Sequence, residues 1–122
     1  ATMDEYDRAM GNIACEVLRA LASHMGLGPC YLSDCYSAAD SFIKLNCYPP
    51  CTKPWAVHGM EPHTDSDLIT LIHQDQVGGL QILKDNYWIN VEPRADALAW
   101  SNDVYKSVKH RVTVNCNEER VS

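Results

Sequence analysis

The stretch Glu61–Leu83, EPHTDSDLITLIHQDQVGGLQIL, decides the fold predicted for this chain. It places His63 and Asp65 just before a run that turns apolar at Leu68, and a polar QDQVGG turn then leads into a second apolar run. Short apolar runs bounded by turn residues indicate β-strands. We therefore expect β-structure from Pro62 onward, with His63 and Asp65 at the mouth of a buried strand.

Further strands are expected on both sides of this stretch. Upstream, SFIKLNCY (41–48) has strand propensity and ends at two prolines, and the residues up to Glu61 read as turns. Downstream, Asp85 and Asn86 form a hairpin-like turn before YWINVEP, and two more strand candidates follow in the last 29 residues, 94–122. The short spacing favours a mostly antiparallel sheet.

An amphipathic helix is expected at the start of the chain. Apolar side chains recur there at steps of three and four, and Gly26 and Gly28 then predict the helix end. The predicted stripe comprises Tyr6, Met10, Ile13, Val17, Leu21 and Met25. We expect one domain over residues 1–122. It would consist of a helix (1–28), a loop (29–40) and a β core (41–122), with the helix packed on a sandwich or barrel.

The bulk composition excludes several partners. The chain has 122 residues and a formal net charge of −6 without a cluster of Lys and Arg, which argues against nucleic acid and anionic membrane surfaces. It shows no secretory leader and no apolar run long enough to span a membrane, so we expect a cytoplasmic protein. Its six cysteines lack paired spacing, so we expect reduced thiols, and Cys47 and Cys51 lack the second ligand pair that structural zinc requires.

Three residues suggest a metal site. Side chains two apart on a strand share a face, so His63 and Asp65 would project together. His110 has the parity of Val108, Val112 and Val114, and therefore faces the apolar side of its own strand. Two histidines and one carboxylate form the facial triad of non-haem Fe(II) oxygenases. The same residues also fit a chance His-x-Asp pair and a hydrogen-bonded core histidine.

Two further pairs outline an acid-binding pocket. Arg120 and Ser122 lie two apart, and a guanidinium fork with a hydroxyl is suited to a carboxylate. Asn46 and Tyr48 could add polar groups from an earlier strand. Taken singly, each pair also fits a solvated surface charge, a frayed terminus or an edge strand.

Several motifs together resemble the catalytic core of plant 2-oxoglutarate and Fe(II)-dependent dioxygenases, and most of all the gibberellin 2-oxidases that act on C20 gibberellins. The motifs are LNCYPPC, PHTDSDLITLIHQDQVGGLQILKDNYWINVEP, DAL, AWSNDVYKSVKHRV and ERVS. The resemblance implies a double-stranded β-helix, which is a cupin-like jelly roll. It implies an enzyme that uses O2 and 2-oxoglutarate to hydroxylate gibberellins at carbon 2.

The resemblance also implies residue roles. The implied iron ligands are His63, Asp65 and His110. The residues implied to bind 2-oxoglutarate are Arg120, Ser122, Asn46 and Tyr48.

The chain departs from the family pattern in two ways. About one strand is missing after Leu98, since DAL runs directly into AWSND. The missing strand lies between Asp65 and His110, which puts the placement of His110 in question. The chain also starts after the family's N-terminal region and stops before a closing strand, so we expect an incomplete jelly roll.

These departures leave two alternatives to a gibberellin-hydroxylating enzyme. One is a non-catalytic remnant of such an enzyme, and the other is a flavonoid-oxidising member of the same superfamily. We expect a monomer that binds a small molecule, although unpaired strands would allow self-association.

Overall fold

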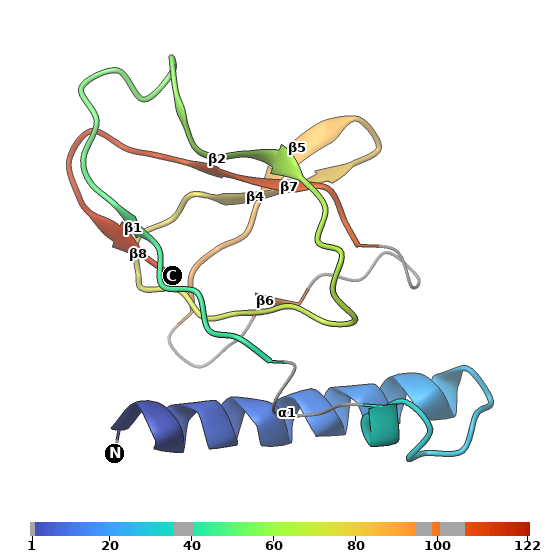
Figure 1. The fold of residues 1–122 in the computed structure, drawn as a ribbon. Coiled ribbons are helices and arrows are strands. Elements are labelled where there is room, and N and C mark those ends of the chain that lie inside the picture. Colours follow the sequence, from blue (N-terminus) through green and yellow to red (C-terminus); the bar gives the residue numbers. More distant parts are fainter. Residues whose placement is uncertain (1, 36–40, 95–98, 101–106) are drawn as a thin grey trace. The chain divides into compact units, whose positions relative to one another are not determined.

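The computed structural model describes residues 2–35, 41–94, 99–100 and 107–122 (Figure 1). Two compact units, Ala1–Lys44 and Leu45–Ser122, make up the chain and are described separately. The elements are α1 (Thr2–His24), the 3-10 helix η1 (Ser33–Cys35), β1 (Cys47–Tyr48), β2 (His58–His63), β3 (Leu71–Ile72), β4 (Leu80–Lys84), β5 (Tyr87–Asn90), β6 (Ala99–Trp100), β7 (His110–Thr113) and β8 (Arg120–Val121).

The first unit consists mainly of α1, which ends where the glycines predict. Gly26 has φ +73°, and the Leu27 N–H donates to the Ala22 carbonyl at 2.9 Å while the Gly26 N–H donates to the Ser23 carbonyl at 3.1 Å. These two bonds form a Schellman motif, which satisfies carbonyls that the helix end leaves unpaired. The expected stop at Gly26 is therefore confirmed.

The buried stripe of α1 differs from the predicted one. Ala14, Leu18 and Ala22 are buried, whereas the predicted Ile13 and Met25 are exposed. Side chains four apart share a helix face, so these three residues form a stripe of their own. The sequence pattern missed it because two of its three members are alanines, which carry little hydrophobic signal.

A four-stranded antiparallel sheet forms the main element of the second unit, with strand order β2-β7-β4-β5. Figure 1 shows β2 and β7 side by side, as their register requires. β4 and β5 form the expected hairpin, whose two turn residues, Asp85 and Asn86, have φ of 50° and 66°. Positive φ at both positions is typical of the tight type I′ turn.

Two small antiparallel pairs complete the second unit. β1 pairs with β8, and β3 pairs with β6. Tyr48, Leu80 and Val112 form the buried core, and Met60, Ile72, Val91 and Val114 pack against it. Burying an aliphatic side chain such as Leu80 stabilises a fold by about 1.5–3 kcal/mol.

The strand boundaries around His63 correct the sequence prediction. β2 begins at His58 and ends at His63, whereas we expected turns up to Glu61 and a strand that starts at Pro62. Asp65 lies in the irregular segment after β2, so the expectation that His63 and Asp65 share one strand is wrong. The register of β2 against β7 is irregular in two places, which hides the alternating pattern of a regular strand.

Two other predictions about strands have mixed outcomes. Of the expected strand over residues 41–48, only Cys47 and Tyr48 form a strand, and Asn46 extends its pairing by two backbone hydrogen bonds to Ser122. Leu98, where a strand is expected to be missing, lies outside the described residues.

No helix in the described part of the chain is long and apolar enough to cross a membrane.

Candidate functional site

His63, Asp65 and His110 converge at one end of the β2–β7 pair. His63 and His110 are register partners, and their ring centroids lie 4.3 Å apart. Asp65 Oδ1 is 3.5 Å from His63 Nε2 and 3.8 Å from His110 Nε2. Among the described residues, this is the one group of three or more His, Cys, Asp or Glu side chains close enough to share an ion.

Backbone hydrogen bonds set the tautomer of both histidines. His63 Nδ1 lies 2.7 Å from the Glu61 carbonyl oxygen, and His110 Nδ1 lies 3.0 Å from the Val108 carbonyl oxygen. A carbonyl oxygen can only accept, so each Nδ1 carries the proton and donates it. In the neutral rings, each Nε2 therefore keeps a free lone pair on the side of Asp65, which is the arrangement that a metal ligand needs.

Asp65 is held by its backbone and is left open at its carboxylate. Its backbone N–H donates to Ser107 Oγ at 2.8 Å, across 42 positions of sequence. Its Oδ2 atom is buried and has no hydrogen-bond partner among the described residues. A buried carboxylate oxygen without a partner is costly, and a cation would satisfy it.

The three ligand groups fit a metal ion. Ligand atoms bound at about 2.1 Å lie roughly 3.0–3.5 Å apart for angles between a right angle and the tetrahedral angle. The observed separations of 3.5 and 3.8 Å from Asp65 Oδ1 are close to this range, and one ligand atom from each of the three residues lies within 4.8 Å of the other two. Imidazole suits zinc, copper, iron and nickel, and two histidines with one carboxylate are the ligand set of non-haem Fe(II) oxygenases.

The predicted acid-binding residues also come together. β8 pairs with β1 so that Arg120 is the register partner of Tyr48, and its guanidinium carbon lies 5.3 Å from the Tyr48 ring centroid. Asn46 and Ser122 exchange two backbone hydrogen bonds, of 2.7 and 3.0 Å. The Arg120 Nη1–H donates to Ser122 Oγ at 2.9 Å. The two sequence-predicted pairs therefore form one cluster.

Arg120 is a buried cation with spare hydrogen-bonding capacity. The residue is 1% exposed, which rules out the solvated surface charge that the sequence alone allowed. Burial lowers the pKa of Arg120, and the nearby Tyr48 and Asp75 oppose this shift. Within the described part of the chain, its Nε atom has no hydrogen-bond partner and no carboxylate forms an ion pair with its guanidinium. This environment is suited to an anionic ligand.

Three positions that contribute to these clusters were missed in the sequence. Ser107 holds the backbone of Asp65, and Gln74 Oε1 accepts from Arg120 Nη2 at 3.0 Å. Gly79 lies against the side chain of Arg120, where a Cβ atom would stand 3.1 Å from Cδ. The available signals were weak: Gln74 lies two residues after the apolar Ile72, and Gly79 is half of a Gly-Gly pair.

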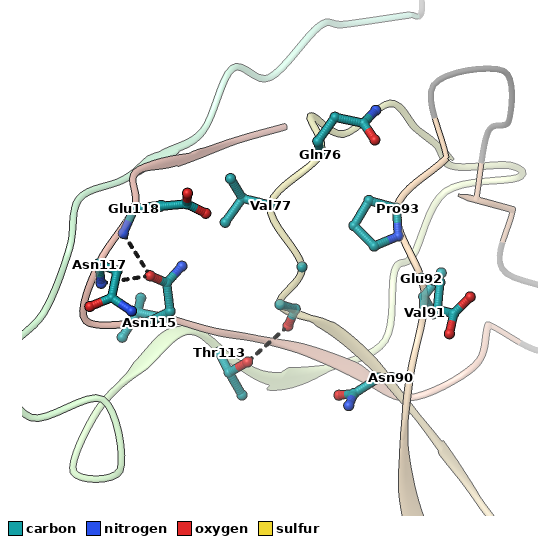
Figure 2. Close-up of a pocket in the computed structure, with 13 residues that line it drawn as sticks. Gln76, Val77, Asn90, Val91, Glu92, Pro93, Thr113, Asn115, Asn117 and Glu118 are labelled. Atoms are coloured by element: carbon teal, nitrogen blue, oxygen red, sulfur yellow. Dashed lines mark hydrogen bonds between the residues drawn. The ribbon is translucent and has the colours of Figure 1, made fainter.

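A surface cavity of about 640 Å³ lies beside the Arg120 cluster and is lined in part by Gly79 (Figure 2). None of the seven sequence-predicted site residues lines it. Its polar groups serve local structure: Asn115 Oδ1 accepts the backbone N–H groups of Asn117 and Glu118, and Thr113 Oγ1 donates to the Gly79 carbonyl. The cavity therefore does not compete with the two clusters as a site.

Among the described residues, no cysteine belongs to a group of side chains that could hold a metal ion. Cys47 and Cys51 are both free, and a hydrogen bond to Glu119, with some desolvation, raises the pKa of the Cys47 thiol. A raised pKa favours the protonated thiol, which is a poor metal ligand.

The fold and the clusters define a mostly β protein with a two-histidine, one-carboxylate constellation. Comparison with known proteins gives the family: the sequence model of the 2OG-Fe(II) oxygenase superfamily matches residues 39–122, and the chain belongs to this superfamily. Iron and 2-oxoglutarate are the cofactor and cosubstrate for which the superfamily is named. The predicted family is thereby confirmed.

The relatives include gibberellin oxidases. The chain is 41% identical over 131 residues to gibberellin 2-beta-dioxygenase 8 of Arabidopsis thaliana, covering 100% of this chain and 39% of that protein. It is 37% identical over 127 residues to gibberellin 20 oxidase 1 of Arabidopsis thaliana, covering 97% of this chain and 34% of that protein. The chain thus spans less than half the length of these relatives. The first alignment is longer than the chain's 122 residues, so that relative has residues without a counterpart here.

A solved structure supports the fold. The crystal structure of JOX2 in complex with 2OG, Fe and JA matches this chain with a TM-score of 0.85 and 34% sequence identity. The match covers 98% of this chain and 39% of JOX2. The predicted jelly roll with an N-terminal helix is therefore confirmed.

Proposed function

We propose that this chain carries the Fe(II) and 2-oxoglutarate site of a dioxygenase. The observation that carries the proposal is the convergence of His63, Asp65 and His110, with both Nε2 lone pairs free and a buried Asp65 oxygen without a partner. These residues would hold Fe(II), which supplies the oxygen-activating chemistry when bound.

The second cluster would bind the cosubstrate. Arg120 offers its unpaired Nε–H and its remaining Nη hydrogens to the distal carboxylate of 2-oxoglutarate, and Ser122 adds a hydroxyl. The Tyr48 ring covers the guanidinium and limits its contact with water. Asn46 holds the cluster through its backbone bonds to Ser122, and we propose that it contacts the cosubstrate too.

We propose a gibberellin as the substrate and carbon 2 as the position hydroxylated. The support is the 41% identity to a gibberellin 2-beta-dioxygenase, compared with 37% to a gibberellin 20 oxidase. Incubation of the Fe(II)-loaded protein with 2-oxoglutarate, O2 and C20 gibberellins, followed by mass spectrometry, would distinguish 2-hydroxylated from 20-oxidised products. Oxidation of a flavonoid supplied in a parallel incubation would instead support the other oxygenase prediction.

The decisive experiment on the site is anaerobic absorption spectroscopy. Fe(II) and 2-oxoglutarate added to the protein should produce the weak visible charge-transfer band of the chelate. His63→Ala should abolish the band, because two remaining ligands do not define the metal face. A band of equal intensity in His63→Ala, or no band in the wild-type protein at high concentration, would contradict the proposal.

Size-exclusion chromatography and thermal melting address the non-catalytic alternative. A monomer whose melting temperature rises with Fe(II) and 2-oxoglutarate supports the enzyme, since a ligand that binds only the folded state stabilises it. An aggregate that responds to neither ligand supports the remnant. The cytoplasmic location also remains a prediction, which a fluorescent fusion would test.

A further inference from the structure

Gln74 makes a buried contact with the guanidinium of Arg120. It lies between β3 and β4, is 7% exposed, and accepts a hydrogen bond from Arg120 Nη2 at 3.0 Å. The two residues are 46 positions apart in the sequence. With Ser122 on Nη1, this bond orients both Nη groups of the guanidinium through neutral oxygen atoms.

The neighbouring carboxylate, Asp75, has a different task. Its Oδ1 accepts the Val77 N–H at 2.9 Å and its Oδ2 accepts the Val121 N–H at 2.6 Å. Its own backbone N–H donates to the Val121 carbonyl at 3.1 Å. Asp75 therefore fastens β8 to the segment before β4, and both of its oxygens are used by backbone donors rather than by Arg120.

Gln74 thus orients the guanidinium of Arg120 without neutralising its positive charge. A carboxylate at position 74 would orient Arg120 equally well, but it would also neutralise the charge and compete with an incoming anion. An apolar side chain there would leave a buried Nη2–H without its partner, which is costly. A neutral amide avoids both problems.

We propose that Gln74 is a positioning residue of the carboxylate site: it orients Arg120 and leaves the positive charge available for the ligand's carboxylate. The inference rests on the proposed function, in which that ligand is 2-oxoglutarate. It predicts that binding of a dicarboxylate requires an amide side chain, rather than a carboxylate, at position 74.

The test uses Gln74→Glu, with Gln76→Glu as the matched control. Gln76 is exposed, lies two residues away and lines the surface cavity, so its substitution adds the same charge without a contact to Arg120. The affinity for 2-oxoglutarate is measured by anaerobic titration of the Fe(II)-loaded protein, and the melting temperature is measured without ligands. The affinity for Fe(II) alone is measured in parallel.

Gln74→Glu should lower the affinity for 2-oxoglutarate by about tenfold or more, because the new carboxylate occupies the guanidinium. The same variant should melt at a higher temperature than wild type without ligands, since a buried cation gains its counter-ion. A residue that served the fold alone would not move the two quantities in opposite directions. Fe(II) affinity and the Gln76→Glu control should stay close to wild type.

Gln74→Met provides a second variant that keeps the volume and removes the acceptor. It should also weaken 2-oxoglutarate binding, by a smaller factor, without adding charge. Wild-type affinity in either folded variant would overturn the inference while leaving the proposed function intact. Failure of the wild-type protein itself to bind 2-oxoglutarate would overturn both.

Discussion

His63 and His110 face each other as register partners where β2 meets β7, with their ring centroids 4.3 Å apart. The antiparallel ladder thus places two of the three candidate ligands by backbone pairing alone. Asp65, two residues beyond His63 in the irregular segment after β2, is the third. Binding of a metal would therefore be coupled to the pairing of β2 with β7, and this coupling leads to the first prediction.

Metal should stabilise the folded protein, and a chelator should reverse the effect. At a free metal concentration of one hundred times Kd, the stabilisation is about 2.7 kcal/mol. His110→Ala and His63→Ala should each remove the metal-induced rise in melting temperature. His63 is the less buried of the two histidines. His73→Ala, at an exposed histidine outside the constellation, should retain it. A full metal response in both ligand variants would show that the ion binds elsewhere.

Ser107→Ala should weaken metal binding although Ser107 is not a ligand. Its hydroxyl accepts the backbone N–H of Asp65, so its loss frees the segment that positions the carboxylate. Groups that orient metal ligands are worth about 10–100-fold in metal affinity. Ser107→Thr keeps the hydroxyl and should stay near wild type in a competition titration with a chromogenic chelator. Equal affinities for the Ala and Thr variants would count against this role.

Arg120→Lys should weaken 2-oxoglutarate binding and leave Fe(II) affinity unchanged. The ammonium keeps the charge but cannot reproduce the fixed fork of the guanidinium or its simultaneous bonds to Ser122 and Gln74. The control is Arg111→Lys, because Arg111 lies over Trp88 on the opposite face of β7 from His110 and Val112. Anaerobic titration with 2-oxoglutarate measures both variants. A loss of Fe(II) affinity in Arg120→Lys would indicate a general disruption of the fold.

Gly79→Ala should destabilise the protein by about 1–3 kcal/mol, the cost of a residue forced into a disfavoured conformation. Gly79 has φ +148°, and a Cβ there would lie 2.6 Å from the Thr113 carbonyl oxygen as well as against Arg120. Gly78→Ala is the matched control, since its Cβ would meet only ordinary contacts with Pro93 at 4.0 Å. Urea denaturation of the two variants gives the difference, and equal midpoints would refute the close-packing argument.

Features that depend on local alternation could be predicted from the sequence. His110 and Val112 are buried while Lys109 is exposed, as the parity of that strand predicts. The Arg-x-Ser spacing likewise predicted the shared side of Arg120 and Ser122, which are now joined by a hydrogen bond. Both predictions succeed because the two-residue period is a property of the extended backbone itself.

Strand boundaries were less predictable for a physical reason. The β2 strand covers His58–His63 although Gly59 and Pro62 weaken its strand propensity. It forms because pairing with β7 supplies the hydrogen bonds. The Leu68–Ile72 run looked like a longer strand, but only Leu71 and Ile72 pair with another segment. Strand formation depends on a partner, and a partner is a tertiary property.

The motifs in the sequence thus predicted the jelly-roll class, the convergence of His63, Asp65 and His110, and the proximity of Arg120 to Ser122. Only the tertiary structure decided that Gln74 faces Arg120 and that Ser107 holds Asp65. These contacts join residues 46 and 42 positions apart. No local periodicity encodes such contacts, because they arise when separate segments are brought together by strand pairing and burial.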